Sequence, residues 1–243
     1  EAADAALKFD AKNIAARMLR SRILASQGSY DEALRWVDEV IAEEPKRLEA
    51  LHLKGEIVWL KTSDAKAALP VFRQALAIDP KYPPAHRSII RIQLHQRDLP
   101  GFRAQVAALK QASPEAIDVA LFETQAALLE GDLKKAGERV QALMKLSPDH
   151  PVIRQLAGAV ELRNGNYRAA EKHLSKALQA APDLPAARRL LGQALLQAGE
   201  PTRALSVLQP LLAQEGASAE VVALAPFRSA AAAGSGRGLG RGG

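Results

Sequence analysis

The sequence contains no cysteine in its 243 residues, which excludes disulfide bonds, thiolate metal sites and cysteine nucleophiles. Aromatic residues make up only 4%, and no run of Val, Ile and Thr alternates with polar residues, so the composition favours an all-helical protein. No stretch approaches the roughly 20 apolar residues that a membrane-spanning helix needs. No signal peptide is present, and we interpret the chain, which begins within a helix-like pattern, as a piece of a longer protein.

A strong excess of one charge is also missing, since 33 Lys and Arg stand against 27 Asp and Glu, for a net charge of +6. The basic residues are spread among acidic ones, whereas a nucleic-acid-binding surface concentrates them on one face. Arg237 and Arg241, in the Gly-rich stretch near the C-terminus, are too few to matter, because such binding strengthens with each phosphate neutralised. We therefore expect no nucleic-acid partner.

The sequence has no recognisable catalytic, metal or cofactor motif. Its histidines form no pair at a spacing of four, which excludes a helical His-Glu-x-x-His zinc site, and no Gly-x-x-x-x-Gly-Lys phosphate loop occurs. We predict a protein without enzymatic activity, metal or cofactor. The histidines are expected to be solvated surface residues: His52, His86, His95, His150 and His173.

The sequence does contain a pattern that repeats about every 34 residues. Apolar, helix-like segments end at prolines separated by 35, 34, 34 and 34 residues, namely Pro45, Pro80, Pro114, Pro148 and Pro182. Proline cannot extend a helix, because it lacks an N–H and clashes with the preceding turn, so each one marks a reversal of the chain. A period of 34 is typical of solenoids built from helix–turn–helix repeats.

Small residues keep the same period. A polar turn begins sixteen or seventeen residues after each proline, and a similar turn precedes Pro45. Four of these turns contain a glycine that supplies the positive φ at a helix end: Gly28, Gly131, Gly165 and Gly199. Two further rows predict close helix contacts: Ser21, Gly55, Thr124, Gly158 and Gly192 in the first helices, and Ala33, Ala68, Ala136, Ala170 and Ala204 in the second. In the third period, Arg97 and Phe102 stand at positions where most of the other periods have glycine and alanine. We therefore expect looser or altered packing in this period.

The segments Gly-x-Tyr-x-x-Ala at 28–33 and 165–170, with a proline at the end of each period, resemble the tetratricopeptide repeat. The resemblance covers six repeats, at 14–47, 48–82, 83–116, 117–150, 151–184 and 185–216. It implies an all-α solenoid, a right-handed superhelix of antiparallel helix pairs that acts as a non-catalytic protein-interaction scaffold. The bulky Trp that the family has at the fourth position of each repeat is missing throughout.

The flanking residues are interpreted as incomplete repeats and a tail. Residues 1–13 are expected to be the end of a preceding repeat helix, and residues 217–227 the start of a further one. Residues 228–243 are rich in Gly, Ser and Arg and are expected to be a disordered or non-native tail.

The resemblance also implies a peptide-binding groove lined by the fifth, ninth and twelfth positions of the first helices. Helical spacing makes these positions one continuous stripe. Arg22, Arg87 and Arg91 would form a basic sector interrupted by Glu56, beside the apolar anchor Trp59, which suits a peptide with an acidic residue next to an apolar one. The full set of expected groove residues is Met18, Arg22, His52, Glu56, Trp59, Arg87, Arg91, Leu94, Leu121, Gln125, Gln155, Arg189 and Gln193.

A second interpretation of this stripe remains open, in which the twelfth-position leucines and Trp59 are core residues. One subtype of the family is excluded, because its clamp for chaperone C-termini uses asparagines at positions where this chain has none. Carbohydrate binding is a weaker alternative, since Trp59 is the one aromatic placed for it.

A finer resemblance concerns residues 156–212, which are similar to the repeat lipoproteins associated with bacterial PEP-CTERM, exosortase and exopolysaccharide systems. It implies a periplasmic or outer-membrane-associated protein, attached to a membrane only through segments absent from this chain, with a partner in envelope export. A cytoplasmic location is the alternative. An alternative function is a regulatory or substrate-recruiting region of a larger enzyme, such as a glycosyltransferase. The sequence leaves the identity of the partner and the oligomeric state open.

Overall fold

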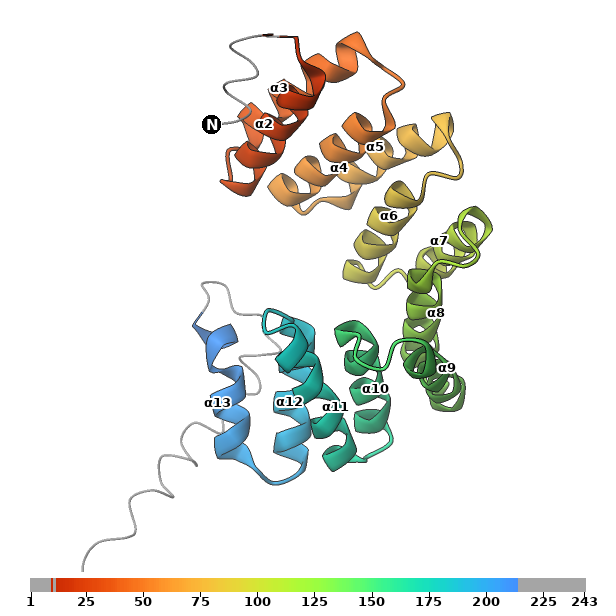
Figure 1. The fold of residues 1–243 in the computed structure, drawn as a ribbon, viewed down its shortest axis with the longest axis vertical. Helices are drawn as coiled ribbons and strands as arrows, with labels where there is room; N and C mark the ends of the chain where they lie inside the picture. The colour runs from red at the N-terminus through yellow and green to blue at the C-terminus, as the bar shows by residue number, and fades with distance from the viewer. Residues whose placement is uncertain (1–9, 11, 214–243) are drawn as a thin grey trace, which may run out of the picture. The chain divides into compact units, whose positions relative to one another are not determined.

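The computed structural model describes residue 10 and residues 12–213. These residues form twelve helices, α2 to α13, and no strand, so the predicted all-α fold is confirmed (Figure 1). The described residues divide into two compact parts, one up to Val119 and one from Ala120, called here the N-terminal and C-terminal parts. None of the described helices has the length and apolar character required to cross a bilayer.

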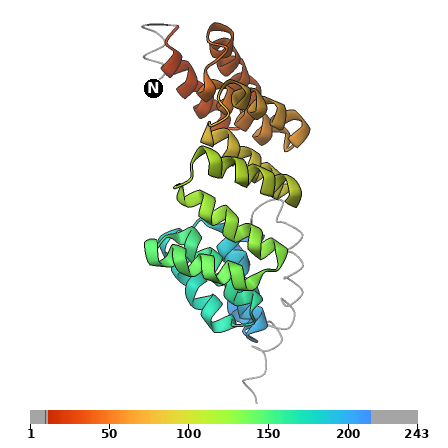
Figure 2. The same cartoon turned by 90° about the vertical axis from the view of Figure 1, so that its right-hand side faces the viewer.

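The N-terminal part consists of helices that pack in chain order, each against the next (Figure 2). They are α2 (Ile14–Ser26), α3 (Tyr30–Glu43), α4 (Leu48–Thr62), α5 (Ala65–Ile78), α6 (Pro83–His95) and α7 (Leu99–Ala112). The first helices of successive hairpins also contact one another, α2 with α4 and α4 with α6. We call the side formed by α2, α4 and α6 the first-helix face.

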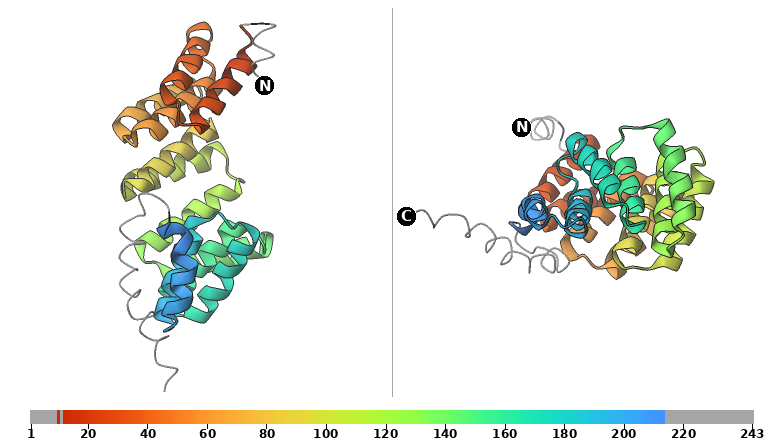
Figure 3. Two further views of the ribbon diagram at one scale, coloured as in Figure 1. Left: turned by 90° about the vertical axis from the view of Figure 1, so that its left-hand side faces the viewer. Right: turned by 90° about the horizontal axis from the view of Figure 1, so that it is seen from below.

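The C-terminal part repeats the arrangement. Its helices are most of α8 (Ile117–Glu130), then α9 (Leu133–Leu146), α10 (Pro151–Arg163), α11 (Tyr167–Ala180), α12 (Pro185–Gln197) and α13 (Pro201–Leu212) (Figure 3). From α9 onward each helix packs against the next, and the first helices α10 and α12 contact each other. The core side chains of α8, α9 and α10 form one cluster, which includes Ala127, Val140 and Leu156.

The turns between hairpins contain the periodic prolines. All five lie in turns just before the start of a first helix. At the turn of Pro80, the Asp79 carboxylate accepts a hydrogen bond from the amide of Lys81 at 2.9 Å, and the Asp79 carbonyl accepts one from Tyr82 at 3.1 Å. The acidic residue thus satisfies two amides that would otherwise lack a partner at the break between helices.

The turns within hairpins need a left-handed residue, as the glycines predict. Gly28, Gly131, Gly165 and Gly199 have φ values between 77° and 80°. The other two turns adopt the same conformation without glycine, at Ser63 (φ 51°) and Arg97 (φ 59°). A side chain in this conformation costs roughly 1–2 kcal/mol, so the surrounding packing must hold these two residues in place.

The predicted close contacts between paired helices are present, and the sizes of their side chains are complementary. A Cβ atom at Gly158 would lie 2.7 Å from Leu174 Cδ2, and one at Gly192 would lie 2.6 Å from Leu208 Cγ. Gly55 faces Phe72 in the same way, with 2.7 Å to the ring. Each glycine therefore makes room for one large side chain from the second helix.

Where the first helix carries a larger residue, the second helix carries valine. Ser21 and Thr124 occupy the glycine position in the first and fourth hairpins, and Val37 and Val140 are the equivalents of Leu174. Ser21 Oγ also donates a 2.8 Å hydrogen bond to the carbonyl of Ala33, so its hydroxyl is satisfied in the core. The summed volume of the two contacting side chains therefore varies less from one of these hairpins to another than the volume of either side chain does.

The third hairpin, α6–α7, is altered but not loose. Phe102 replaces the small alanine of the other hairpins and is fully buried, at 0% exposure. Ile90, in the glycine position, is also fully buried. The expectation of altered packing is therefore confirmed, whereas looser packing is not observed.

In four of the six repeats a polar side chain occupies the fourth position, where the family has Trp. His86 donates to the carbonyl of Pro80 (2.8 Å) and accepts from Gln105 of α7. Arg188 likewise donates to the carbonyl of Pro182 at 2.8 Å. Arg154 contacts Asp149 (3.2 Å) and His173 of α11 (3.4 Å). Each of these three side chains connects its own first helix to the turn before it and to the second helix of the same hairpin. The sequence did not predict that role.

Some expectations lie outside the described residues. The preceding helix end within residues 1–9, the further helix at residues 217–227 and the tail at residues 228–243 belong to this group.

Candidate functional site

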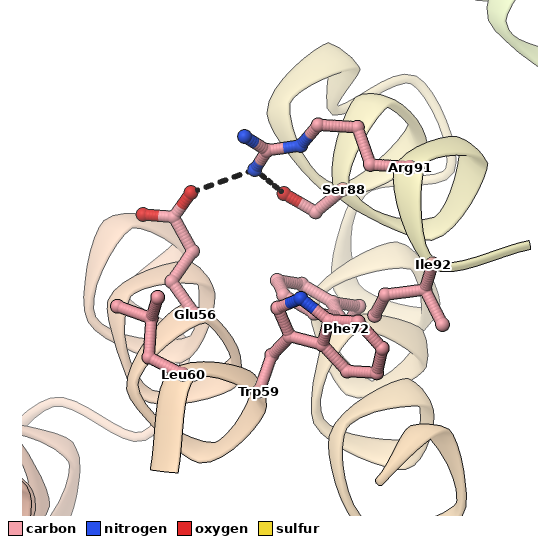
Figure 4. A pocket seen from close by; sticks show the side chains of 7 residues that line it. All are labelled: Glu56, Trp59, Leu60, Phe72, Ser88, Arg91 and Ile92. Carbon is pink, nitrogen blue, oxygen red and sulfur yellow. Dashed lines mark hydrogen bonds and ion pairs between the residues drawn. The ribbon is translucent and has the colours of Figure 1, made fainter. Parts of the chain in front are cut away.

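A recess opens on the first-helix face between α4 and α6 (Figure 4). Its volume is about 310 Å³, at the lower end of the range of ligand pockets and large enough for one large side chain. Apolar side chains from three helices form its floor and one lip: Trp59 and Leu60 of α4, Phe72 of α5 and Ile92 of α6. Phe72 reaches the recess because Gly55 leaves space above it.

The other edge of the recess is polar. Arg91 Nη2 donates to Glu56 Oε1 at 3.0 Å and to Ser88 Oγ at 3.1 Å, which joins α4 and α6. Ser88 Oγ also lies 3.0 Å from His52 Nε2. The serine hydroxyl is therefore shared between an arginine and a histidine, and it fixes both of them beside the apolar floor.

The surroundings of His52 favour its neutral form. Burial lowers its pKa, and the nearby Arg91 and Arg22 act in the same direction, against the opposing effect of Glu56. The ring lies 5.6 Å from that of Phe72 and 6.1 Å from that of Tyr82, measured between centroids. Burial also raises the pKa of Tyr82. A neutral His52 can accept a hydrogen bond from the Ser88 hydroxyl, whose oxygen can in turn accept the hydrogen bond from Arg91.

The structure brings together several of the residues expected in the groove, and it places others elsewhere. Glu56, Trp59 and Arg91 all line the recess. Arg87 instead forms an ion pair with Asp118 of α8, so the expected basic sector is partly neutralised. Met18 is in the hydrophobic core at 7% exposure and is not available on the surface.

The remaining expected residues differ in exposure. Arg22 is exposed on α2, and Leu94 is half-buried on α6. In the C-terminal part, Gln193 is exposed and the others are half-buried: Leu121, Gln125, Gln155 and Arg189. Of the other twelfth-position residues, Leu128 and Leu162 belong to the core, and Trp59 is partly buried against its own core cluster. The interpretation of the twelfth row as packing residues thus applies to Leu128 and Leu162.

Sequence reasoning missed four residues of the recess and one of its neighbours. Leu60, Ser88 and Ile92 lie one position from the expected stripe, and a wider stripe on each helix would have included them. Phe72 comes from a second helix, and its signal was Gly55, because a glycine in a helix contact leaves space for a large partner. Asp118 lies in the next repeat, and no motif marks it.

The prediction that all histidines are solvated is wrong. His86 is 4% exposed, because it fills the fourth position against the incoming turn. His52, His150 and His173 are half-buried, and His95, the exposed one, packs its ring edge-on against Trp59 at 5.2 Å. In the described part of the chain, no three His, Cys, Asp or Glu residues are grouped so as to hold a metal ion.

This architecture was compared with known protein families and solved structures. Two sequence models of the tetratricopeptide repeat match, one at residues 60–126 and 161–225 and the other at residues 1–47 and 24–83. No functionally curated protein matches the chain.

Solved structures show the same fold at low sequence identity. A tetratricopeptide repeat protein from Parabacteroides merdae ATCC 43184 has a TM-score of 0.71 and 13% identity, over 94% of this chain and 86% of that one. A chain of the APC/C hetero-tetramer Cut9–Hcn1 has a TM-score of 0.68 and 19% identity, over 85% of this chain and 41% of that one. The type IV pilus biogenesis factor PilW has a TM-score of 0.65 and 16% identity, over 88% and 98%.

Proposed function

The chain belongs to the tetratricopeptide repeat family, and on this premise we propose that it is a non-catalytic scaffold that binds a peptide or protein segment on the first-helix face of its N-terminal part. Repeat proteins of this kind present extended surfaces made from many stacked elements. The recess between α4 and α6 supports the proposal, because it combines exposed apolar surface with an ordered arginine. Both features are typical of binding hot spots.

Site-specific photocrosslinking tests this proposal. A photoreactive amino acid replaces Leu60, at the lip of the recess, in the full chain, and bound proteins from the source organism are identified after irradiation. The matched control carries the same residue at Ile78, another exposed apolar residue, at the end of α5. We expect a partner captured from position 60 and not from position 78. Equal capture at both positions, or capture at neither, would contradict binding at the recess.

A finer proposal concerns the cellular role. The similarity of residues 156–212 to exosortase-associated repeat proteins supports a partner in bacterial envelope export of exopolysaccharide, and a periplasmic or outer-membrane-associated location. The alternative proposal is a regulatory or substrate-recruiting region of a larger enzyme such as a glycosyltransferase, in the cytoplasm. Cell fractionation with an antibody against residues 12–213 separates the locations, and the complete reading frame separates a longer repeat array from a catalytic domain.

A further inference from the structure

We infer that the recess between α4 and α6 binds a peptide segment in which a large aliphatic side chain lies next to a carboxylate. This inference rests on the proposed function and names the chemistry of the partner at the same site. Its apolar half starts from Leu60, which is 55% exposed beside the nearly buried Phe72 and Ile92. An aliphatic side chain in the recess would cover Leu60 and Trp59, and removal of apolar surface from water favours binding.

The polar half of the site is Arg91, whose side chain is 64% exposed. Among the residues that the structure describes, only its Nη2 makes hydrogen bonds, to Glu56 and Ser88. Nη1 and Nε retain donors that a ligand carboxylate can accept. Because two bonds already hold the guanidinium in place, little side-chain freedom remains to be lost on binding.

The charges around the recess favour a carboxylate over an ammonium group. Glu56 is the acidic group of the recess, and it is already engaged by Arg91 and lies 3.8 Å from His52. Arg22 of α2 is exposed and close enough to influence the ionisation of His52 and Tyr82. Arg87 is neutralised by Asp118, and Glu49, which also acts on Tyr82, lies 3.8 Å from Arg47, so Arg22 and Arg91 against Glu56 leave an excess of positive charge on this face.

The spacing of the two halves restricts the ligand. On α4, Glu56, which holds the Arg91 guanidinium, and Leu60 are four residues apart. The polar and apolar halves are therefore separated by about one helical turn, roughly 5 Å. Residues two apart in an extended peptide, or three or four apart on a helix, present a carboxylate and an aliphatic side chain on one face at about this separation.

Selection from a random-peptide display library on the full chain tests the inference. We expect selected peptides to carry Asp or Glu two to four residues away from Leu, Ile or Val. Fluorescence anisotropy with one selected peptide should show about tenfold weaker binding to Arg91→Glu, because a charge-assisted hydrogen bond is replaced by repulsion. Arg73→Glu, at an exposed arginine of α5, is the matched control and should bind like the wild type.

A second variant keeps the apolar half testable without disturbing the fold. Leu60→Ala should reduce the preference for Leu over Ala in the peptide and leave the preference for Asp over Asn unchanged. Selection on Arg91→Glu should enrich Lys in place of Asp or Glu. Circular dichroism melting curves show that each variant is folded.

Several results would overturn the inference. Enrichment of basic peptides on the wild type would do so, as would selected peptides that bind both variants normally. A concentration-dependent dimer that is abolished by Leu60→Asp would show that a second copy occupies the recess. If no peptide is enriched above an unrelated protein, the inference fails. The photocrosslinking result then decides separately whether the scaffold function also fails.

Discussion

The hairpins α10–α11 and α6–α7 bring their paired helices together with different side chains. In α10–α11 the contact consists of Gly158, Leu174 and the small Ala170, and the turn is made by Gly165. In α6–α7 the equivalent residues are Ile90, Val106, Phe102 and Arg97. Both sets are buried at the contact, and both turns are left-handed. The comparison teaches that this hairpin requires filled space and a left-handed turn rather than particular residues.

The largest expected effect on stability comes from replacing Phe102 of the third hairpin with alanine, the residue at the same position in the fifth hairpin. Phe102→Ala leaves a cavity in place of a fully buried ring and should lower the free energy of unfolding by about 3–5 kcal/mol. Both tryptophans, Trp36 and Trp59, lie in the N-terminal part, so the urea midpoint measured by tryptophan fluorescence reports on that part. An unchanged midpoint would show that Phe102 does not support the hairpin.

The next largest effect on stability comes from replacing the Gly and Leu pair of the fifth hairpin with the Ser and Val pair of the first. Gly158→Ser should cost about 1–3 kcal/mol, because its Cβ and hydroxyl collide with Leu174. Adding Leu174→Val copies the Ser21 and Val37 pair of the first hairpin and should recover part of that loss.

A double-mutant cycle measures this compensation. We expect a favourable coupling energy of about 0.5–3 kcal/mol between the two substitutions, measured by urea unfolding followed by circular dichroism. Simple addition of the two single effects would contradict the complementarity of sizes.

A smaller effect concerns the two turns. Arg97→Gly should stabilise the chain and Gly165→Arg should destabilise it, each by about 1 kcal/mol, because only glycine adopts this conformation freely. Thermal melting of both variants measures the two shifts. Shifts in the same direction would mean that the side chain of Arg97 contributes more than its backbone strain costs.

The smallest effect depends on pH. Burial and the adjacent Arg154 lower the pKa of His173 below its usual value near 6.5, so the folded chain keeps this residue neutral where the unfolded chain binds a proton. Stability from this residue is complete above pH 6.5 and decreases as the pH falls from 6.5 toward the folded pKa.

His173→Gln tests this dependence with the residue that the third hairpin has at the same position, Gln105. The urea midpoint of the wild type should fall between pH 7.5 and pH 5.5, and the fall should be smaller in the variant. His95→Gln, at an exposed histidine, should keep the wild-type slope. A steeper slope in His173→Gln would give the opposite sign and refute the argument.

The period in the sequence predicted the helices well, because proline, glycine and small residues act through local sterics that one chain reveals. Ile14, Leu48 and Pro83 begin first helices at the residues where the expected repeats begin. Three residues of the stripe on the first helices, Glu56, Trp59 and Arg91, lie together in one recess, since side chains on one helical face share a direction.

The rest of the site depends on pairs of residues that are distant in the chain. The pairing of Arg87 with Asp118 and the burial of His86 depend on which polar groups meet after packing, and no spacing rule states this. Met18 lies at a groove position by periodicity but is covered by the neighbouring core. Local rules therefore found the hairpins, and tertiary packing decided which groove residues remain accessible.

The contact between a glycine and its large partner is completed inside a single hairpin, as in Gly192 with Leu208. Duplication or loss of a whole 34-residue segment in the gene would leave every such contact intact in the remaining segments. An array of this kind can therefore change its length in evolution without compensating substitutions at these positions, and an engineer could shorten or extend it by the same step.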